Sequence, residues 1–144
     1  MLPARHRLRE RADFTSAVRG SGAVRAGGRL IVVHANRADA RADSPPRVGF
    51  VVSKAVGNAV VRNRTKRRLR AATASRLTGI PHGVDVVVRA NPASAQAGWD
   101  ELEASLATQL ESAVRKLEQR TRAAGPATSR TTSLDGRAAT GPAG

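Results

Sequence analysis

The sequence predicts a single α/β domain, an α+β sandwich in which helices pack on a small mixed sheet. The 144 residues are the length of one domain. Short β-branched runs alternate along the chain with amphipathic helical patterns, and this interleaving is typical of a layered sandwich. With no Cys, no Tyr, two Phe and one Trp, the core must consist of Val, Leu, Ile and Ala, and disulfides and thiolate metal sites are excluded.

Three segments show helical patterns: residues 11–20, 58–77 and 99–120. The first ends at Gly20, which is a typical helix stop, and the second begins at Asn58, a favourable N-cap residue. The third has the longest run of apolar residues at helical spacing, with acidic residues in its first turn and basic residues in its last. It is the strongest helix prediction.

Strands are predicted over residues 29–35, 47–54 and 84–90, with a further short strand near residues 23–25. The first two are expected to pair as an antiparallel hairpin across a long polar loop. Residues 91–98 should form a turn or a short helical bend. Beyond about residue 122 the chain is rich in Gly, Pro, Ser, Thr and Ala, so we expect disorder there.

The charge of the chain favours a polyanionic partner. It has 25 Lys and Arg against 11 Asp and Glu, a formal net charge of +14, which suits a nucleic acid or an anionic membrane surface. No apolar run approaches the roughly 20 residues of a membrane span, and the N-terminus lacks the apolar region of a secretory signal. We therefore expect a cytoplasmic protein with no membrane partner.

Residues 57–70, GNAVVRNRTKRRLR, combine a dense positive charge with apolar residues. On a helical wheel, Val61, Thr65, Leu69 and Ala72 gather on one side, which can lie on the sheet. The remaining surface presents Arg62, Asn63, Arg64, Lys66, Arg67 and Arg70. Residues 44–84 contain nine Lys or Arg and no Asp or Glu, so ion pairs within this region cannot neutralise the helix.

Three interpretations of this segment were compared: a solvated basic face, a membrane-surface helix and a phosphate-binding helix. A membrane helix needs bulkier apolar residues opposite its charges than Val61, Thr65 and Ala72. Phosphates would offset the repulsion between the cations and release counterions on binding. Arg suits bidentate phosphate contacts, and Asn63 can reach a base edge or a sugar hydroxyl. The pattern favours RNA.

Residues 53–70 also contain the pattern S-K-x-x-G-N-A-V-x-R-N-R-x-K-R-x-x-R, formed by Ser53, Lys54, Gly57, Asn58, Ala59, Val60, Arg62, Asn63, Arg64, Lys66, Arg67 and Arg70. This pattern resembles the signature of the bacterial ribonuclease P protein family. The resemblance covers about residues 7–117. It implies an RNA-binding domain over residues 1–121, with residues 122–144 as a disordered tail. The implied fold has the order α-β-β-β-α-β-α, a four-stranded mixed sheet and a left-handed β-α-β crossover, against the usual rule.

The resemblance further implies a protein subunit of ribonuclease P, a ribonucleoprotein endoribonuclease that removes the 5′ leader from precursor tRNA and whose substrate range the protein broadens. In this family the chemistry belongs to a catalytic RNA that uses Mg²⁺, so this chain should need no catalytic residue, no metal ligand and no protein partner. Carried over by position, the residues facing the catalytic RNA are Lys54, Asn58, Arg62, Asn63, Arg64, Lys66, Arg67 and Arg70. Those facing the leader are Phe14, Val18, Val33 and Arg89, with Phe14 as a stacking platform.

The chain departs from the family at Val18 and Val33, where relatives often have aromatic residues. We therefore expect leader binding to depend more on charge than on stacking. His6, His34 and His82 show no metal-ligand spacing, and no nucleophilic triad or phosphate loop is visible. Two other classes stay open on the residues alone: a non-enzymatic RNA-binding protein, such as a ribosomal protein or RNA chaperone, and an autonomous protein nuclease.

Overall fold

The computed structural model describes residues 6–8, 11–20, 22–37 and 43–124. The main elements are α1 (Arg11–Arg19), β1 (Val24–Gly27), β2 (Ile31–Arg37), β3 (Arg47–Val51), α2 (Ala59–Ala74), β4 (Val84–Ala90) and α3 (Trp99–Ala124). Short 3₁₀ helices connect them: η3 (Lys54–Val56), η4 (Leu77–Gly79) and η5 (Pro92–Gln96). The order α-β-β-β-α-β-α is the predicted one, and η5 confirms the helical bend expected over residues 91–98.

The four strands form one mixed sheet with the order β1-β2-β4-β3. The pairs β1–β2 and β2–β4 are antiparallel, and β3–β4 is parallel. The predicted hairpin between residues 29–35 and 47–54 is therefore wrong, because β4 lies between β2 and β3. The sequence of β4, VDVVVRA, is buried at six of its seven positions, as expected of a strand with neighbours on both edges and layers on both faces.

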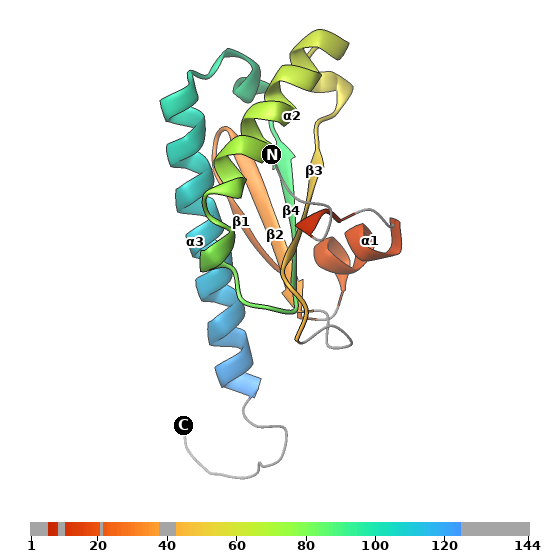
Figure 1. The fold of residues 1–144 in the computed structure, drawn as a ribbon, viewed down its shortest axis with the longest axis vertical. Coiled ribbons are helices and arrows are strands. Elements are labelled where there is room, and N and C mark those ends of the chain that lie inside the picture. The colour runs from red at the N-terminus through yellow and green to blue at the C-terminus, as the bar shows by residue number, and fades with distance from the viewer. Residues whose placement is uncertain (1–5, 9–10, 21, 38–42, 125–144) are drawn as a thin grey trace.

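The chain crosses the sheet between β3 and β4 through α2. In Figure 1 these two strands point upward and α2 lies in front of the sheet. Strand β4 lies to the left of β3, so the chain moves from right to left as it crosses from one strand to the other. This is a left-handed crossover, which confirms the expected fold and departs from the right-handed geometry of most such units. As a result, α2 lies over the β3 side of the sheet, while α3 packs across β1 and β2.

The two faces of the sheet have different covers. Helices α2 and α3 cover one face and form the main core, whose largest buried side chains include Ile31, Val33, Leu69, Val86, Val88, Leu102 and Leu106. Helix α1 lies on the opposite face, where Leu8, Ala17 and Val87 form a smaller buried cluster. Successive strand residues point to opposite faces, so each strand contributes alternate residues to the main core and to the face that carries α1.

Two helix ends differ from their predicted positions. Helix α2 stops at Ala74 and a separate 3₁₀ turn, η4, follows. Helix α3 continues to Ala124, past the boundary expected at residue 121. The predicted disordered tail covered residues 122–144, but residues 122–124 belong to α3. Residues 125–144 lie outside the described residues, so disorder there stays a prediction. Within the described part of the chain, no helix combines the length and apolar character needed to cross a membrane.

A largely buried ion pair joins the beginnings of β3 and β4. The Arg47 guanidinium donates from Nε and Nη2 to the two carboxylate oxygens of Asp85, at 3.0 and 2.8 Å. Its Nη1 lies 3.1 Å from a carboxylate oxygen of Asp13 in α1. The hydrogen bonding of Arg47 to the Asp85 carboxylate is the main reason that the pKa of Arg47 is raised. This cluster ties α1 to the end of the parallel strand pair.

We predict that Arg47→Gln lowers the free energy of unfolding by about 3 kcal/mol, because it removes the bidentate cation from a carboxylate that is nearly inaccessible to water. Chemical denaturation followed by circular dichroism measures the change. Arg29→Gln is the matched control: it breaks the Arg29–Glu101 pair, whose side chains are 67% and 52% exposed, and should cost no more than about 0.5 kcal/mol. Equal losses in the two variants would contradict this role of burial.

Candidate nucleic-acid interface

The inner side of α2 packs on the sheet as the helical wheel predicted. Thr65, Leu69 and Ala72 are buried and Val61 is partly buried. The hydroxyl of Thr65 donates to the Val61 carbonyl at 3.0 Å, and that of Thr73 donates to the Leu69 carbonyl at 2.7 Å. Both hydroxyls are satisfied by hydrogen bonds to the preceding turn, so the two threonines can be buried where the helix packs on the sheet.

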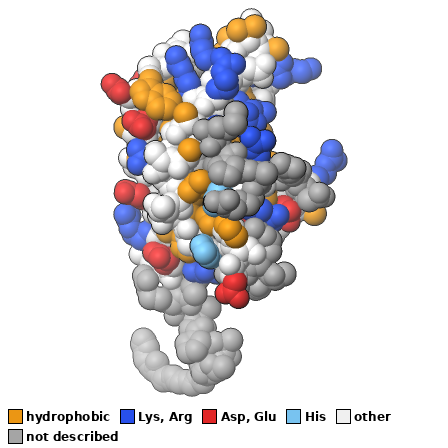
Figure 2. Space-filling model, in the orientation of Figure 1, with side chains coloured by type: hydrophobic (Ala, Val, Ile, Leu, Met, Phe, Trp, Pro, Cys, Tyr) orange, Lys and Arg blue, Asp and Glu red, His pale blue; other side chains and the backbone are white. Residues whose placement is uncertain are grey.

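The rest of α2 forms what we call the basic helix face, defined as Arg62, Asn63, Arg64, Lys66, Arg67 and Arg70. Asn63, Arg64 and Arg67 are exposed and the others are half-buried. Figure 2 shows the Lys and Arg side chains gathered over this helix. No side chain of α2 forms an ion pair with a carboxylate among the described residues. The positive charge of this face is therefore available to a polyanion.

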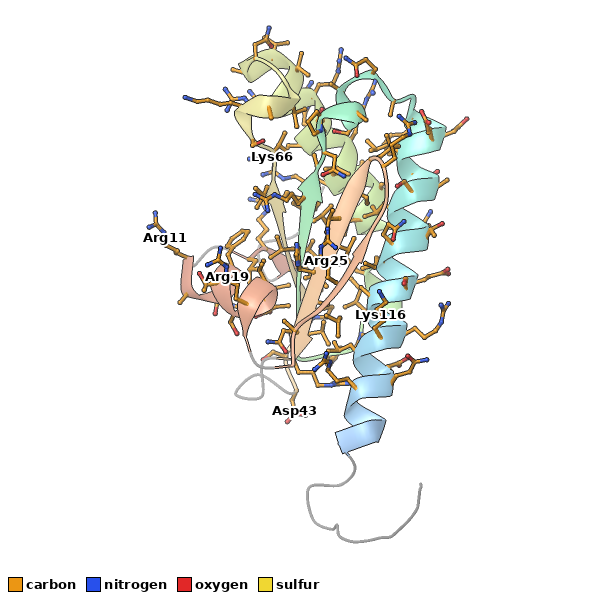
Figure 3. The ribbon with its side chains drawn as sticks, turned by 180° about the vertical axis from the view of Figure 1, so that it is seen from behind. Arg11, Arg19, Arg25, Asp43, Lys66 and Lys116 are labelled. Atoms are coloured by element: carbon orange, nitrogen blue, oxygen red, sulfur yellow. The ribbon has the colours of Figure 1, made fainter. Side chains whose placement is uncertain are left out.

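One flank of α2 rests against η5. Arg64 donates to the carbonyl of Ala95 at 3.4 Å, and Arg68 donates to that of Ala97 at 3.2 Å. The row of Arg62, Lys66 and Arg70 lies on the other flank, by the helical geometry, toward the side of β3 (Figure 3). The structure thus divides the basic helix face into a flank held by backbone carbonyls and a flank turned toward the sheet edge.

The residues that precede α2 lie at its N-terminus. Lys54 is exposed in η3, and Asn58 is the N-cap residue, as predicted, with its side-chain oxygen accepting from the Val61 N–H at 3.0 Å. A Cβ at Gly57 would lie 2.9 Å from Cγ1 of Val61, so glycine allows the chain to turn closely against the first helical turn. Lys54 and Asn58 therefore lie next to the first turn of the basic helix face.

A groove of about 360 Å³ lies between α1 and the sheet face that α2 does not cover. Its lining comes from α1, β2, β3 and β4 and consists of Phe14, Thr15, Val18, Arg19, His34, Val51, Val87 and Arg89. Arg19 and Arg89 are exposed at its rim. The described lining contains one Phe ring, two Arg side chains, one His imidazole and no carboxylate. Such a lining suits a single-stranded polyanion with bases that can stack.

The ring of Phe14 sits directly over Gly49 of β3. A Cβ built at Gly49 would overlap the ring atoms Cζ and Cε1 and would lie 3.1 Å from Cβ of Leu8. Glycine is therefore required at this strand position for the ring to reach the sheet. Phe14 is half-buried, so the protein fixes the ring as one wall of the groove and leaves part of it accessible.

One residue predicted for the groove lies elsewhere. Val33 is fully buried on the face covered by α2 and α3, so it does not line the groove; the neighbouring His34 does, because successive strand residues point to opposite faces. Burial lowers the pKa of His34, and the nearby Arg25 and Arg89 guanidiniums lower it further. Phe14, Val18 and Arg89, the other residues predicted to face the leader, line this groove together, whereas Thr15, Arg19, Val51 and Val87 were not anticipated.

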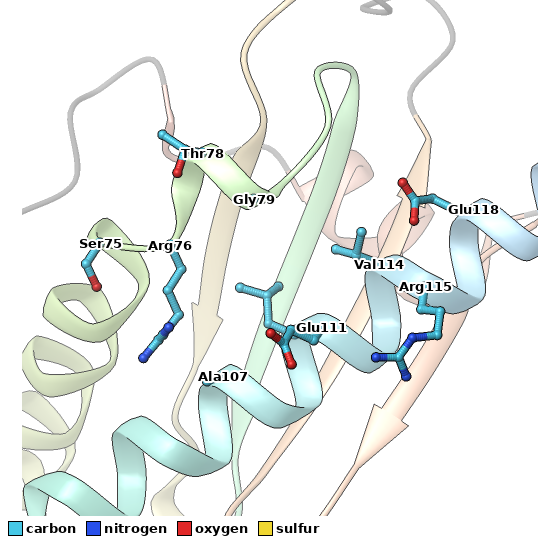
Figure 4. Close-up of a pocket in the computed structure, with 10 residues that line it drawn as sticks. Ser75, Arg76, Thr78, Gly79, Ala107, Glu111, Val114, Arg115 and Glu118 are labelled. Atoms are coloured by element: carbon cyan, nitrogen blue, oxygen red, sulfur yellow. The ribbon is translucent and has the colours of Figure 1, made fainter.

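A second hollow, about 450 Å³, lies between the end of α2 and α3 (Figure 4). It contains Arg76 and Arg115 but also Glu111 and Glu118. Arg76 additionally lies 3.9 Å from Glu103. The mixed charge makes this hollow a poor site for a polyanion, which leaves the basic helix face and the groove as the better candidates.

Comparison with known proteins identifies the family. A model of the family Ribonuclease P matches residues 2–114. The chain belongs to the ribonuclease P protein family. The ribonuclease P protein component of Kocuria rhizophila is 53% identical over 116 residues, covering 81% of this chain and 98% of that protein. The component from Streptomyces bikiniensis is 47% identical over 123 residues, covering 81% and 95%.

Solved structures of the family share this fold. The ribonuclease P protein of Staphylococcus aureus matches with a TM-score of 0.66 and 27% identity, covering 75% of this chain and 94% of that one. The protein of Thermotoga maritima matches with a TM-score of 0.62 and 25% identity, covering 77% and 97%. The chain is thus a protein subunit of ribonuclease P, an endoribonuclease of tRNA processing, and its partner is the ribonuclease P RNA.

We predict that Gly49→Ala destabilises the protein by about 2 kcal/mol, since the added methyl group forces the Phe14 ring off the sheet. The loss should be smaller when Phe14→Ala is also present, because the smaller side chain makes room for the methyl group. A double-mutant cycle of unfolding free energies measures this coupling. Additive effects would show that the ring and the glycine are not in contact.

Proposed function

We propose that this subunit docks on the catalytic RNA of ribonuclease P through the basic helix face and holds the 5′ leader of precursor tRNA in the groove beside α1. The holoenzyme then removes the leader endonucleolytically and produces the mature 5′ end. The observation that supports this best is the basic helix face itself. It combines a buried inner side with outward cations that no described carboxylate neutralises.

The chemistry of the basic helix face suits structured RNA. Arg guanidiniums can form bidentate contacts with phosphate oxygens, and Asn63, between two arginines, offers an amide for a base edge or a ribose hydroxyl. The helix is already formed in the free protein and its N-cap is in place. Docking therefore does not require this segment to fold first, which reduces the entropic cost of association.

The chemistry of the groove suits a single strand. The Phe14 ring offers a face for stacking, which tolerates any base. Arg19 and Arg89 lie where they can contact phosphates, and Val18, Val51 and Val87 provide an apolar floor. With one aromatic ring in the groove, we propose that leader affinity depends mainly on charge, as the sequence led us to expect.

Catalysis is proposed to belong to the RNA, with Mg²⁺ supplying the Lewis-acid chemistry of phosphodiester hydrolysis. The donor chemistry of the described residues does not fit a protein-held Mg²⁺ site, because no group of three or more His, Cys, Asp or Glu side chains comes together there. We therefore assign no step to a metal ion bound by this chain. The protein's own contribution is to bind and orient RNA.

The decisive experiment is reconstitution. Catalytic RNA and precursor tRNA are mixed at low Mg²⁺, with and without the protein, and leader removal is measured. We expect the protein to stimulate cleavage, and expect none from the protein alone. Binding without stimulation would favour a general RNA-binding protein or chaperone, and cleavage by the protein alone would favour an autonomous nuclease.

In the same system we predict that Arg67→Gln weakens binding of the catalytic RNA and lowers the slope of log K against log salt by about one, the value for one lost phosphate contact. Arg67 is exposed at the crest of α2, so the fold should be unaffected. Arg29→Gln, which removes an exposed arginine from the far edge of the sheet, is the control and should leave the slope unchanged. An unaltered slope for Arg67→Gln would place this residue outside the contact.

We predict that leader binding strengthens as the pH falls. His34 is neutral at pH 7 in the free protein because its pKa is lowered, and a phosphate in the groove would raise that pKa. Binding then takes up a proton in the interval between the free and bound pKa values, so affinity should rise by up to about tenfold per pH unit as the pH falls through the bound value, and should level off below the free one. Affinities for a leader oligonucleotide between about pH 8 and about pH 5 test this.

His34→Gln should remove the dependence, whereas His82→Gln, in an exposed turn, should retain it. The folded-state pKa of His34 lies below its unfolded value, so its contribution to stability is present above about pH 6.5 and is lost as the pH falls through the folded-state pKa. Circular dichroism at each pH therefore has to accompany the binding data. A pH profile that is the same in wild type and His34→Gln would exclude His34 from the leader site.

A further inference from the structure

The positive charge of the groove does not end at its lining. On the sheet face that bears the groove, Gly49, Val87, His34 and Arg25 occupy one row across β3, β4, β2 and β1. Arg25 is the direct partner of His34 on the outer strand, and neighbouring strands are about 4.8 Å apart. Arg25 is exposed, while the flanking Val24 and Ala26 are buried on the α3 side. The floor of the groove therefore continues onto an exposed cation.

Beyond β1, helix α3 adds two more cations. Lys116 and Arg120 are one helical turn apart, and together with Gln119, Arg25, Ala23 and Val24 they line a shallow hollow along the sheet edge. Lys116 Nζ donates to the backbone carbonyl of Arg25 at 2.8 Å, which fixes the ammonium beside the strand. We name Arg25, Lys116, Gln119 and Arg120 the edge patch.

The edge patch is unusual for α3 because it contains no acid. The other side of the helix mixes charges, since Arg115 lines a hollow together with Glu111 and Glu118 (Figure 4). The lining of the edge patch includes three cations and no Asp or Glu, and the side chains of Arg25 and Arg120 make no hydrogen bond or ion pair with a described residue. A cluster of like charges without counter-charge fits an external anion.

The groove and the edge patch form one band. Figure 3 views the sheet from the side of the groove and shows Arg19 on α1, Arg25 on β1 and Lys116 on α3 following one another across the molecule. His34 and Arg89 belong to the same band. Burial is the main cause of the lowered pKa of His34, and the positive charges of Arg25 and Arg89 lower it further.

We propose that the edge patch is an additional RNA-binding site, which takes the phosphate backbone of the leader segment that leaves the groove across β1. The proposal deepens the proposed function and rests on it. The occupant is a single strand because the band continues the proposed leader groove and follows one row of residues across the sheet, from Val87 through His34 to Arg25. Phosphates are the groups recognised, so the contact is independent of base sequence.

The test measures equilibrium binding of precursor tRNAs to the reconstituted holoenzyme, with leaders lengthened one nucleotide at a time. Lys116→Gln and Arg120→Gln should leave affinity for the shortest leaders unchanged and reduce it once the leader passes a threshold length. Each should also lower the salt slope for long leaders by about 0.7, the value for one single-strand phosphate contact. Arg115→Gln, which removes one charge from the other side of α3, is the matched control and should change neither quantity.

Three outcomes overturn the proposal: losses that are equal at every leader length, salt slopes that do not change, or weaker binding of the catalytic RNA itself, which would mean that the edge patch contacts that RNA. Failure of the proposed function looks different. In that case wild-type affinity would not depend on the leader at all, and Arg89→Gln in the groove would have no effect on short leaders.

Discussion

The position of β4 between β2 and β3 is the constraint on which both the basic helix face and the groove depend. Because β3 and β4 are parallel, the chain has to cross the sheet between them, and α2 is that crossing. Its apolar side is buried against the sheet, so its charged sides face outward. The same strand turns Val87 and Arg89 to the opposite face, where α1 completes the groove. The Arg47–Asp85 pair stands at the start of both strands and links this register to α1.

The basic helix face shows how a fold tolerates a concentration of like charge. Repulsion between cations four residues apart costs a few tenths of a kcal/mol per pair. Burial of Leu69 alone contributes on the order of 2 kcal/mol, and the Asn58 cap contributes about 1 kcal/mol. Packing therefore exceeds repulsion, and the helix persists without RNA. This distinguishes the protein from arginine-rich segments that fold only on binding, because the entropic cost of ordering such segments reduces their affinity.

Local patterns predicted the helices well and the sheet less well, for identifiable reasons. The helical period and the Asn58 cap are readable within a few residues, so α2 starts where expected and buries the expected side. Strand pairing is not local. In the sequence β4 is separated from β3 by α2, and nothing near residues 29–35 indicates that β4 lies between β2 and β3 in the sheet. Ile31, Val32 and Val33 are all buried, so the run has no polar alternation to show which face each residue takes. Val33 was assigned to the leader site from the family resemblance, and nothing in this run indicated that His34 points to that face instead. The Arg47–Asp85 pair spans 38 residues and has no local signal.

The composition of the groove bears on how it could serve many substrates. An aromatic-rich cleft gains affinity base by base through stacking, at about 1–3 kcal/mol each, whereas this groove has one ring, fixed over Gly49. Its remaining polar groups, Arg19, His34 and Arg89, belong to three different elements, so its positive potential exists only when α1, β2 and β4 are assembled. Under the proposed function, the groove would recognise phosphates, which are common to every leader, and a preformed array of cations would discriminate little between sequences. The same property would make leader affinity sensitive to salt and to pH in a way that a stacking cleft would not be, because His34 would add a titratable cation to two permanent ones.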